Sequence, residues 1–137
     1  MSGIFVLKPF RRPRLWLGLW LLAVVTVAVL SLVNLSGLPP VPEGGDKVEH
    51  FLAYALLSAS AMQLFAARRG CVVVALLLVA LGIVLELAQG SLTSTRMADA
   101  YDALANALGV SAGFAPRLTP LSRLLLLIDA RLAPARP

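Results

Sequence analysis

The sequence predicts an all-α polytopic membrane protein, a four-transmembrane-helix bundle with both its N- and C-termini in the cytoplasm. Of its 137 residues, 59% are hydrophobic and 14% are charged, whereas a soluble domain is about half apolar and a quarter charged. The apolar residues are gathered in long runs rather than spread through short amphipathic segments. The basic residues stand at the ends of those runs, as they do where charge orients membrane helices.

The first span is expected at 15–35, a run of about 20 residues without a charge, which is long enough to cross a bilayer. It follows a basic segment, 1–14, that holds Lys8 and three arginines. A basic segment before an apolar run also resembles a secretory signal. The run is too long for one and no Ala-x-Ala-like cleavage site follows it, so an uncleaved span is the better interpretation.

Three further helices are expected after the loop at 34–45, which is rich in proline and glycine and cannot easily continue a helix. Asp46 is placed as the N-cap of the second helix. Arg68-Arg69-Gly70 ends that helix, and a short loop at 90–95 separates the third helix from the fourth. The expected ranges of the three helices are 46–67, 71–89 and 97–115.

The last segment, 117–137, is expected to be a cytoplasmic tail with an amphipathic helix, which leaves 15–116 as the four-helix membrane domain. One side of the tail helix is apolar, and its charged residues lie elsewhere. Two placements remain open, on the membrane surface or against the bundle. The apolar side comprises Leu121, Leu124, Leu125, Ile128 and Leu132, and the charged residues are Arg123, Asp129 and Arg131.

The distribution of basic residues predicts the orientation in the membrane. If the N-terminus is inside, only Lys47 and Arg96 lie outside, and this asymmetry satisfies the positive-inside rule. Both termini are therefore expected in the cytoplasm. The residues inside are Lys8, Arg11, Arg12, Arg14, Arg68, Arg69, Arg117, Arg123, Arg131 and Arg136.

Polar residues from three of the expected helices fall at one level of the membrane, near its outer face. On each helix they share one stripe, and an unpaired polar group in hydrocarbon costs a few kcal/mol. We therefore expect the stripes to face one another, with Gly109 and Gly113 allowing close approach of the fourth helix. The predicted polar cluster comprises Asp46, Lys47, His50, Tyr54, Glu86, Gln89, Arg96, Asp99, Asp102 and Asn106.

This cluster, counted with Glu49, contains more acidic than basic groups. The excess implies protonated carboxyls, a bound divalent cation or a cationic ligand. No cofactor is assigned, although Mg²⁺ or Ca²⁺ is possible; zinc is disfavoured by the single His and the lack of a nearby Cys. Cys71 is the only cysteine, which excludes an intrachain disulfide. Nucleic acid is not an expected partner, because no basic strip with interleaved aromatic residues is present.

The cluster motifs resemble those of the VanZ-like family of membrane proteins. They are Asp46-Lys47-x-x-His50 with Tyr54, Glu86-x-x-Gln89, and Arg96 with Asp99, Asp102, Asn106 and Gly109, spanning about 46–113. The loop before Arg96 lacks the Pro-Gly of the family. The resemblance implies a multi-pass protein of the bacterial cytoplasmic (inner) membrane and cell envelope. The family's named member is linked to low-level resistance to the glycopeptide teicoplanin, and the resemblance supplies no biochemical activity.

Two hypotheses for function follow. In the first, the cluster is an outward-facing site that binds or processes an envelope lipid or a lipid-linked cell-wall intermediate, with Glu86 and His50 as candidate catalytic residues. In the second, the protein is a non-catalytic scaffold or partner subunit, and the cluster only fixes helix packing. Arg96 would then pair with Asp99 or Asp102. A transporter is disfavoured because the stretch 72–81 carries no polar stripe. The oligomeric state is not predicted.

Overall fold

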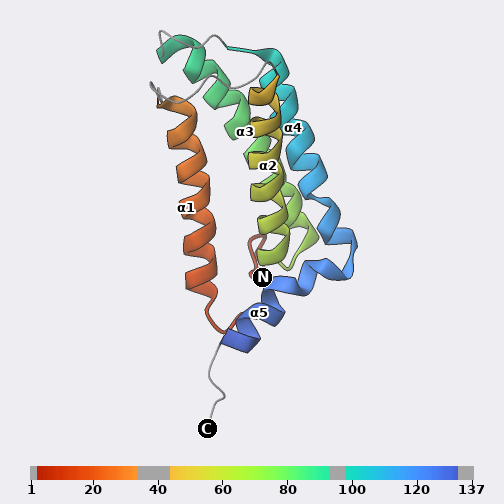
Figure 1. The fold of residues 1–137 in the computed structure, drawn as a ribbon. Coiled ribbons are helices and arrows are strands. Elements are labelled where there is room, and N and C mark those ends of the chain that lie inside the picture. Colours follow the sequence, from red (N-terminus) through yellow and green to blue (C-terminus); the bar gives the residue numbers. More distant parts are fainter. Residues whose placement is uncertain (1–2, 34–43, 93–97, 133–137) are drawn as a thin grey trace.

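The computed structural model, which describes residues 3–33, 44–92 and 98–132, is all-helical apart from an isolated bridge between Leu7 and Phe65 within those ranges (Figure 1). In Figure 1, α2, α3 and α4 lie together and α1 lies on one flank. The long helices are α1 (Pro13–Leu32), α2 (Gly45–Leu64), α3 (Arg68–Leu92) and α4 (Ala100–Gly113). Three short helices follow them, namely η1 (Ala115–Leu118), η2 (Pro120–Arg123) and α5 (Leu124–Leu132).

Two helices within the described ranges, α1 and α3, are long and apolar enough to cross a membrane. They coincide with the spans expected at 15–35 and 71–89. The other two long helices begin with polar residues, and α4 has only 14 residues. A helix of that size is about 21 Å long, less than the roughly 30 Å of a bilayer's hydrocarbon layer. The structure thus supports two candidate spans by length and composition.

Many large apolar side chains lie on the outside of the bundle, and several polar side chains are buried inside it beside an apolar core. In α1 no residue is buried, and Leu56 of α2 and Leu76 of α3 are 68% and 64% exposed. By contrast, Glu86 and Asn106 are only 4% and 2% exposed. Buried ionisable side chains are uncommon in soluble proteins, and extended exposed apolar surface marks contact with a membrane or a partner protein.

Helices α2 and α4 approach each other closely at two glycines. A Cβ atom on Gly109 would lie 2.3 Å from the carbonyl oxygen of Phe51, and one on Gly113 would lie 2.3 Å from that of Ala55. Between the two glycines, the hydroxyl of Ser58 donates to the carbonyl of Val110 (2.8 Å). The close approach predicted for the Gly109-x-x-x-Gly113 motif is confirmed.

The junction between α2 and α3 differs from the prediction. Helix α2 ends at Leu64, not Ala67, because the N-terminal segment pairs with the chain there. The backbone N–H of Lys8 donates to the carbonyl of Leu64 (2.8 Å), and the N–H of Ala66 donates to that of Val6 (2.8 Å). The stretch 68–70 therefore begins α3 instead of ending α2.

Other helix ends also differ. The N-cap of α2 is Gly44, which has a φ of 78°, so Asp46 lies in the first turn of the helix. An acidic side chain there interacts favourably with the positive end of the helix dipole. Helix α3 continues past Gln89 to Leu92. Helix α4 begins later than expected because Asp99 caps it, its side chain accepting a hydrogen bond from the backbone N–H of Tyr101 (2.8 Å).

The C-terminal tail packs against the bundle, which was one of its two expected placements. Asp129 of α5 is buried and accepts hydrogen bonds from the indole N–H of Trp16 (2.8 Å) and the backbone N–H of Arg11. The side-chain amide of Gln63 donates to the carbonyl of Leu121 (2.8 Å). Leu127 stays exposed, so α5 is fastened by its polar residue and keeps an apolar outer face.

Lys8 links the N-terminal segment to two other parts of the chain. Its ammonium group donates to the carbonyls of Met62 (2.8 Å) and Ser122. Burial lowers the pKa of Lys8, and the positive charge of Arg117 lowers it further. This network was not predicted, because in the sequence Lys8 is one of several basic residues before an apolar run.

We predict that Gly109→Ala destabilises the protein, because the added methyl group would meet the backbone of α2. Overpacking of this kind costs about 1–3 kcal/mol or more. Thermal unfolding of the purified protein in detergent measures the effect. Gly18→Ala is the matched control, since nothing lies within 4 Å of a Cβ at Gly18. Equal melting temperatures for the two variants would contradict the packing described for α2 and α4.

We predict that the attachment of α5 weakens in acid. Burial raises the pKa of Asp129, but the hydrogen bonds from Trp16 and Arg11 and the charge of Arg12 outweigh it and hold the pKa below its usual range. The ionised carboxylate therefore stabilises the fold at pH values above the pKa that Asp129 has in the unfolded chain. This stabilisation is lost as the pH falls through the lowered pKa of the folded protein. Hydrogen exchange of 124–132 measures the loss.

At neutral pH, Asp129→Ala should speed this hydrogen exchange about tenfold or more, because a buried N–H donor left without an acceptor costs about 1–3 kcal/mol. Arg131→Ala, at an exposed position of the same helix, should leave the exchange rate unchanged. Unchanged exchange in Asp129→Ala would show that the carboxylate does not hold α5.

Candidate functional site

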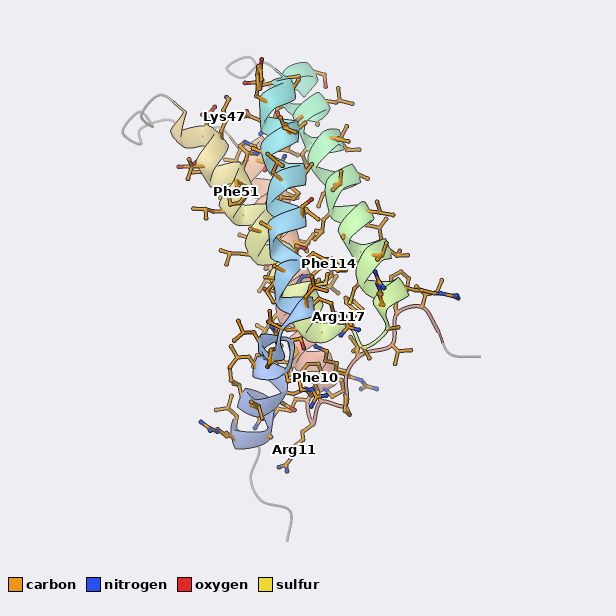
Figure 2. The ribbon with its side chains drawn as sticks, turned by 90° about the vertical axis from the view of Figure 1, so that its right-hand side faces the viewer. Phe10, Arg11, Lys47, Phe51, Phe114 and Arg117 are labelled. Atoms are coloured by element: carbon orange, nitrogen blue, oxygen red, sulfur yellow. The ribbon has the colours of Figure 1, made fainter. Side chains whose placement is uncertain are left out.

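The predicted polar cluster gathers at one end of the bundle, where α2 and α4 begin and α3 ends. Figure 2 shows Lys47 at this end, with Arg11 and Arg117 at the other. The described members are Asp46, Lys47, His50 and Tyr54 of α2, Glu86 and Gln89 of α3, and Asp99, Asp102 and Asn106 at the start of α4. Arg96 lies outside the described residues.

Lys47 joins α2 to the start of α4. Its ammonium nitrogen lies 2.9 Å from a carboxylate oxygen of Asp99, 3.2 Å from one of Asp102 and 3.4 Å from one of Asp46. The hydrogen bond from Lys47, followed by that from the backbone N–H of Tyr101, lowers the pKa of Asp99. Lys47 thus makes the pairing with Asp99 and Asp102 that was expected of Arg96.

His50 is at the centre of the cluster. Its Nδ1 lies 3.1 Å from the side-chain oxygen of Asn106 and 3.5 Å from Oε1 of Glu86. Its Nε2 lies 4.0 Å from Oδ2 of Asp102. Because the amide oxygen of Asn106 can only accept, this contact favours the tautomer that carries its proton on Nδ1. Nε2 then presents a lone pair.

Two carboxylates of the cluster are buried without full hydrogen bonding. Glu86 is 4% exposed and Asp102 is 8% exposed. Neither oxygen of Glu86 has a hydrogen-bond partner of good geometry among the described residues, although the backbone N–H of Asp99 lies near it, and Oδ1 of Asp102 likewise has none. Lys47 approaches Oδ1 of Asp102 without the direction of a hydrogen bond. Buried polar groups are normally satisfied, so these oxygens point to a ligand, a proton or an ion.

Gln89 and Gly82 complete the interior of the cluster. The amide of Gln89 donates to the backbone carbonyl of Ser31 (2.6 Å), which fastens α3 to the end of α1. A Cβ on Gly82 would lie 3.1 Å from Asn106 and 3.3 Å from the ring of Tyr54. The absence of a side chain at Gly82 therefore leaves space for the side chains of Asn106 and Tyr54.

A cleft of about 240 Å³ opens between α1 and α2 and reaches the cluster. The α1 wall is mostly apolar, with Ser31 at its end, and the α2 wall carries His50 and Tyr54. The lining residues are Val27, Leu30, Ser31, Glu49, His50, Ala53 and Tyr54. Sequence reasoning missed the share of α1 in this site, because that run contains no ionisable residue. From the sequence, Glu49 was counted among the acidic groups but was not predicted to line the site.

Three residues of the cluster could hold a metal ion. One ligand atom from each of His50, Glu86 and Asp102 lies within 4.8 Å of the other two. The arrangement permits two kinds of chemistry, proton transfer between His50 and Glu86 and coordination of a cation. Both use the residues that were predicted as catalytic candidates.

Comparisons of the chain with protein-family models, with curated proteins and with solved structures find no match. The resemblance to VanZ-like proteins therefore rests on the motif residues alone.

Proposed function

We propose that this protein is a multi-pass component of the bacterial cytoplasmic membrane, similar to the VanZ-like proteins. Its polar cluster faces the outer side and binds the polar headgroup of an envelope lipid or a lipid-linked cell-wall intermediate. The observation that carries this proposal is the pair of buried carboxylates, Glu86 and Asp102, whose oxygens lack hydrogen-bond partners beside a cleft that reaches His50. Effects on glycopeptide susceptibility would follow from such binding.

The proposed arrangement has four spans and both termini in the cytoplasm. The apolar outer surfaces of α1 and α3 support it, as does the exposure of Leu56 on α2 and Leu108 on α4. Helix α4 is short, but together with η1 it runs beside α2 to the basic end of the bundle (Figure 1). The starts of α1 and α3 bring arginines to that end, as the positive-inside rule requires for a cytoplasmic face.

The cleft has the character that a lipid headgroup needs. Its α1 wall, with Val27 and Leu30, suits hydrocarbon, and its α2 wall offers His50 and the Tyr54 hydroxyl. A bound headgroup would meet the Tyr54 hydroxyl, which has no hydrogen-bond partner among the described residues, and His50, which contacts Glu86 behind it. Without a cation in the site, Glu86 and His50 are our candidates for proton transfer to or from it, because the two side chains lie 3.5 Å apart.

A non-catalytic scaffold is the second candidate function. The ion pairs of Lys47 and the close approach at Gly109 favour it, because both fix helix packing. Glu86 argues against a purely structural cluster, since a buried carboxylate without hydrogen-bond partners weakens packing.

We predict that single cysteines will report opposite faces of the membrane. In a Cys71→Ala background, Glu49→Cys should react with a membrane-impermeant maleimide added to intact spheroplasts. Leu118→Cys, at a position 81% exposed in η1, should react only after the membrane is opened. Labelling of Leu118→Cys in intact spheroplasts would overturn the proposed orientation.

We predict that an envelope lipid copurifies with the protein and is lost when the cluster is altered. Native mass spectrometry of the detergent-extracted protein should show one bound lipid mass. The variants Glu86→Gln and His50→Gln should lose it while keeping wild-type abundance and melting temperature. The control Gln63→Ala lies at the opposite end of α2 and should keep the lipid. If binding and abundance fall together, the cluster is structural and the scaffold hypothesis holds.

A further inference from the structure

We propose that His50, Glu86 and Asp102 bind a divalent cation of the Mn²⁺ type, held between α2, α3 and α4. This inference deepens the proposed function and rests on it only for the chemistry of the headgroup. The cation site itself is argued from the three side chains and their surroundings.

The first argument is convergence. The three residues come from separate helices, yet one ligand atom of each lies within 4.8 Å of the other two. Ligands about 2.0–2.2 Å from a small cation lie roughly 3 to 4.4 Å apart. We expect a rotation of the Glu86 side chain, whose Oε1 now lies 3.5 Å from Nδ1 of His50, to bring the three ligand atoms to coordination distance.

The second argument is unsatisfied charge. Both oxygens of Glu86 and one oxygen of Asp102 are buried without a hydrogen-bond partner. Among the described residues, Lys47 is the only Lys or Arg beside Asp102, where Asp46 and Asp99 share it, and no Lys or Arg pairs with Glu86. A buried carboxylate with no cation close to it is strongly destabilising, and a divalent ion would offset the charge of both.

The third argument is the orientation of the imidazole. Asn106 accepts from Nδ1 of His50 (3.1 Å), which leaves the lone pair on Nε2. Nε2 is also the nitrogen that lies 4.0 Å from Oδ2 of Asp102. Histidines that bind metals commonly donate their other N–H to a carbonyl or carboxylate oxygen, and Asn106 has that role here.

The ligand set indicates the class of ion. Two carboxylates favour hard cations such as Mg²⁺, Ca²⁺ and Mn²⁺, and an imidazole favours transition metals. Mn²⁺ satisfies both preferences. Three protein ligands leave further coordination positions for water or for an oxygen of a bound molecule.

The cation would change what the site attracts. The described acidic groups repel a phosphate-bearing headgroup, whereas a divalent ion on Glu86 and Asp102 supplies a positive centre for phosphate oxygens. We therefore assign a phosphate-containing lipid as the headgroup class. In the cation-bound state, Glu86 and His50 are ligands, and proton transfer between them belongs to the cation-free site.

The test uses the full chain purified in detergent, stripped with EDTA and titrated with Mn²⁺ alone, with free Mn²⁺ followed by electron paramagnetic resonance. We expect one Mn²⁺ per chain and a higher melting temperature in its presence. Glu86→Gln and Asp102→Asn should each weaken Mn²⁺ binding about tenfold or more. Gln63→Ala, at the opposite end of α2, should bind Mn²⁺ as the wild type does.

The melting temperature of metal-free Glu86→Gln should equal or exceed that of the metal-free wild type, because the change removes an unpaired buried charge. A loss of Mn²⁺ binding in the folded Glu86→Gln variant then shows that Glu86 is a ligand of the cation and not only a structural residue. The inference is overturned if the wild type takes up no Mn²⁺ at millimolar concentration, or if Glu86→Gln binds like the wild type. Copurified lipid without Mn²⁺ uptake would overturn the cation site and leave the proposed function standing. Mn²⁺ uptake without copurified lipid would support the cation site and overturn the proposed lipid binding.

Discussion

The close approach of α2 and α4 is the constraint on which the rest of the structure depends. Without side chains at Gly109 and Gly113, the backbones meet at the carbonyls of Phe51 and Ala55. This contact, in the second half of α4, holds the two helices close together, and nearer their starts Lys47 reaches the acids of α4 and His50 reaches Asn106. Helix α3 then supplies Glu86 from the third side. The polar cluster is a product of backbone packing as much as of its own charges.

Much of this arrangement could be predicted from the sequence, because helical periodicity and the cost of burying polar groups act on the same residues. His50, Glu86 and Asp102 share no neighbourhood in the chain, yet each lies on the polar stripe of its helix, and the structure brings them together. The glycine motif of the fourth helix was equally readable. The ends of the helices could not be predicted in this way. Asp99 caps α4 through a local hydrogen bond, and Gly44 caps α2 with a positive φ, and composition reveals neither.

The features that sequence reasoning missed involve backbone atoms or single polar residues within apolar runs. The carbonyl of Ser31 accepts from Gln89, and the carbonyl of Met62 accepts from Lys8. Neither acceptor depends on its side chain, so no residue pattern predicts it. Asp129 did leave a signal, being the one carboxylate in a leucine-rich tail, but its partner on α1 lies more than 100 positions away. Pairings over such separations need coordinates.

Asp129 also bears on how the chain assembles during synthesis. Trp16 and Asp129 are separated by 113 positions and Arg11 and Asp129 by 118, so the earliest described helix is fastened by the latest one. Contacts at such separation form only after the intervening chain exists. Until the last helix has been synthesised, the indole N–H of Trp16 lacks the acceptor that it has in the folded protein. Truncation before α5 would leave the N-terminal helix without this attachment.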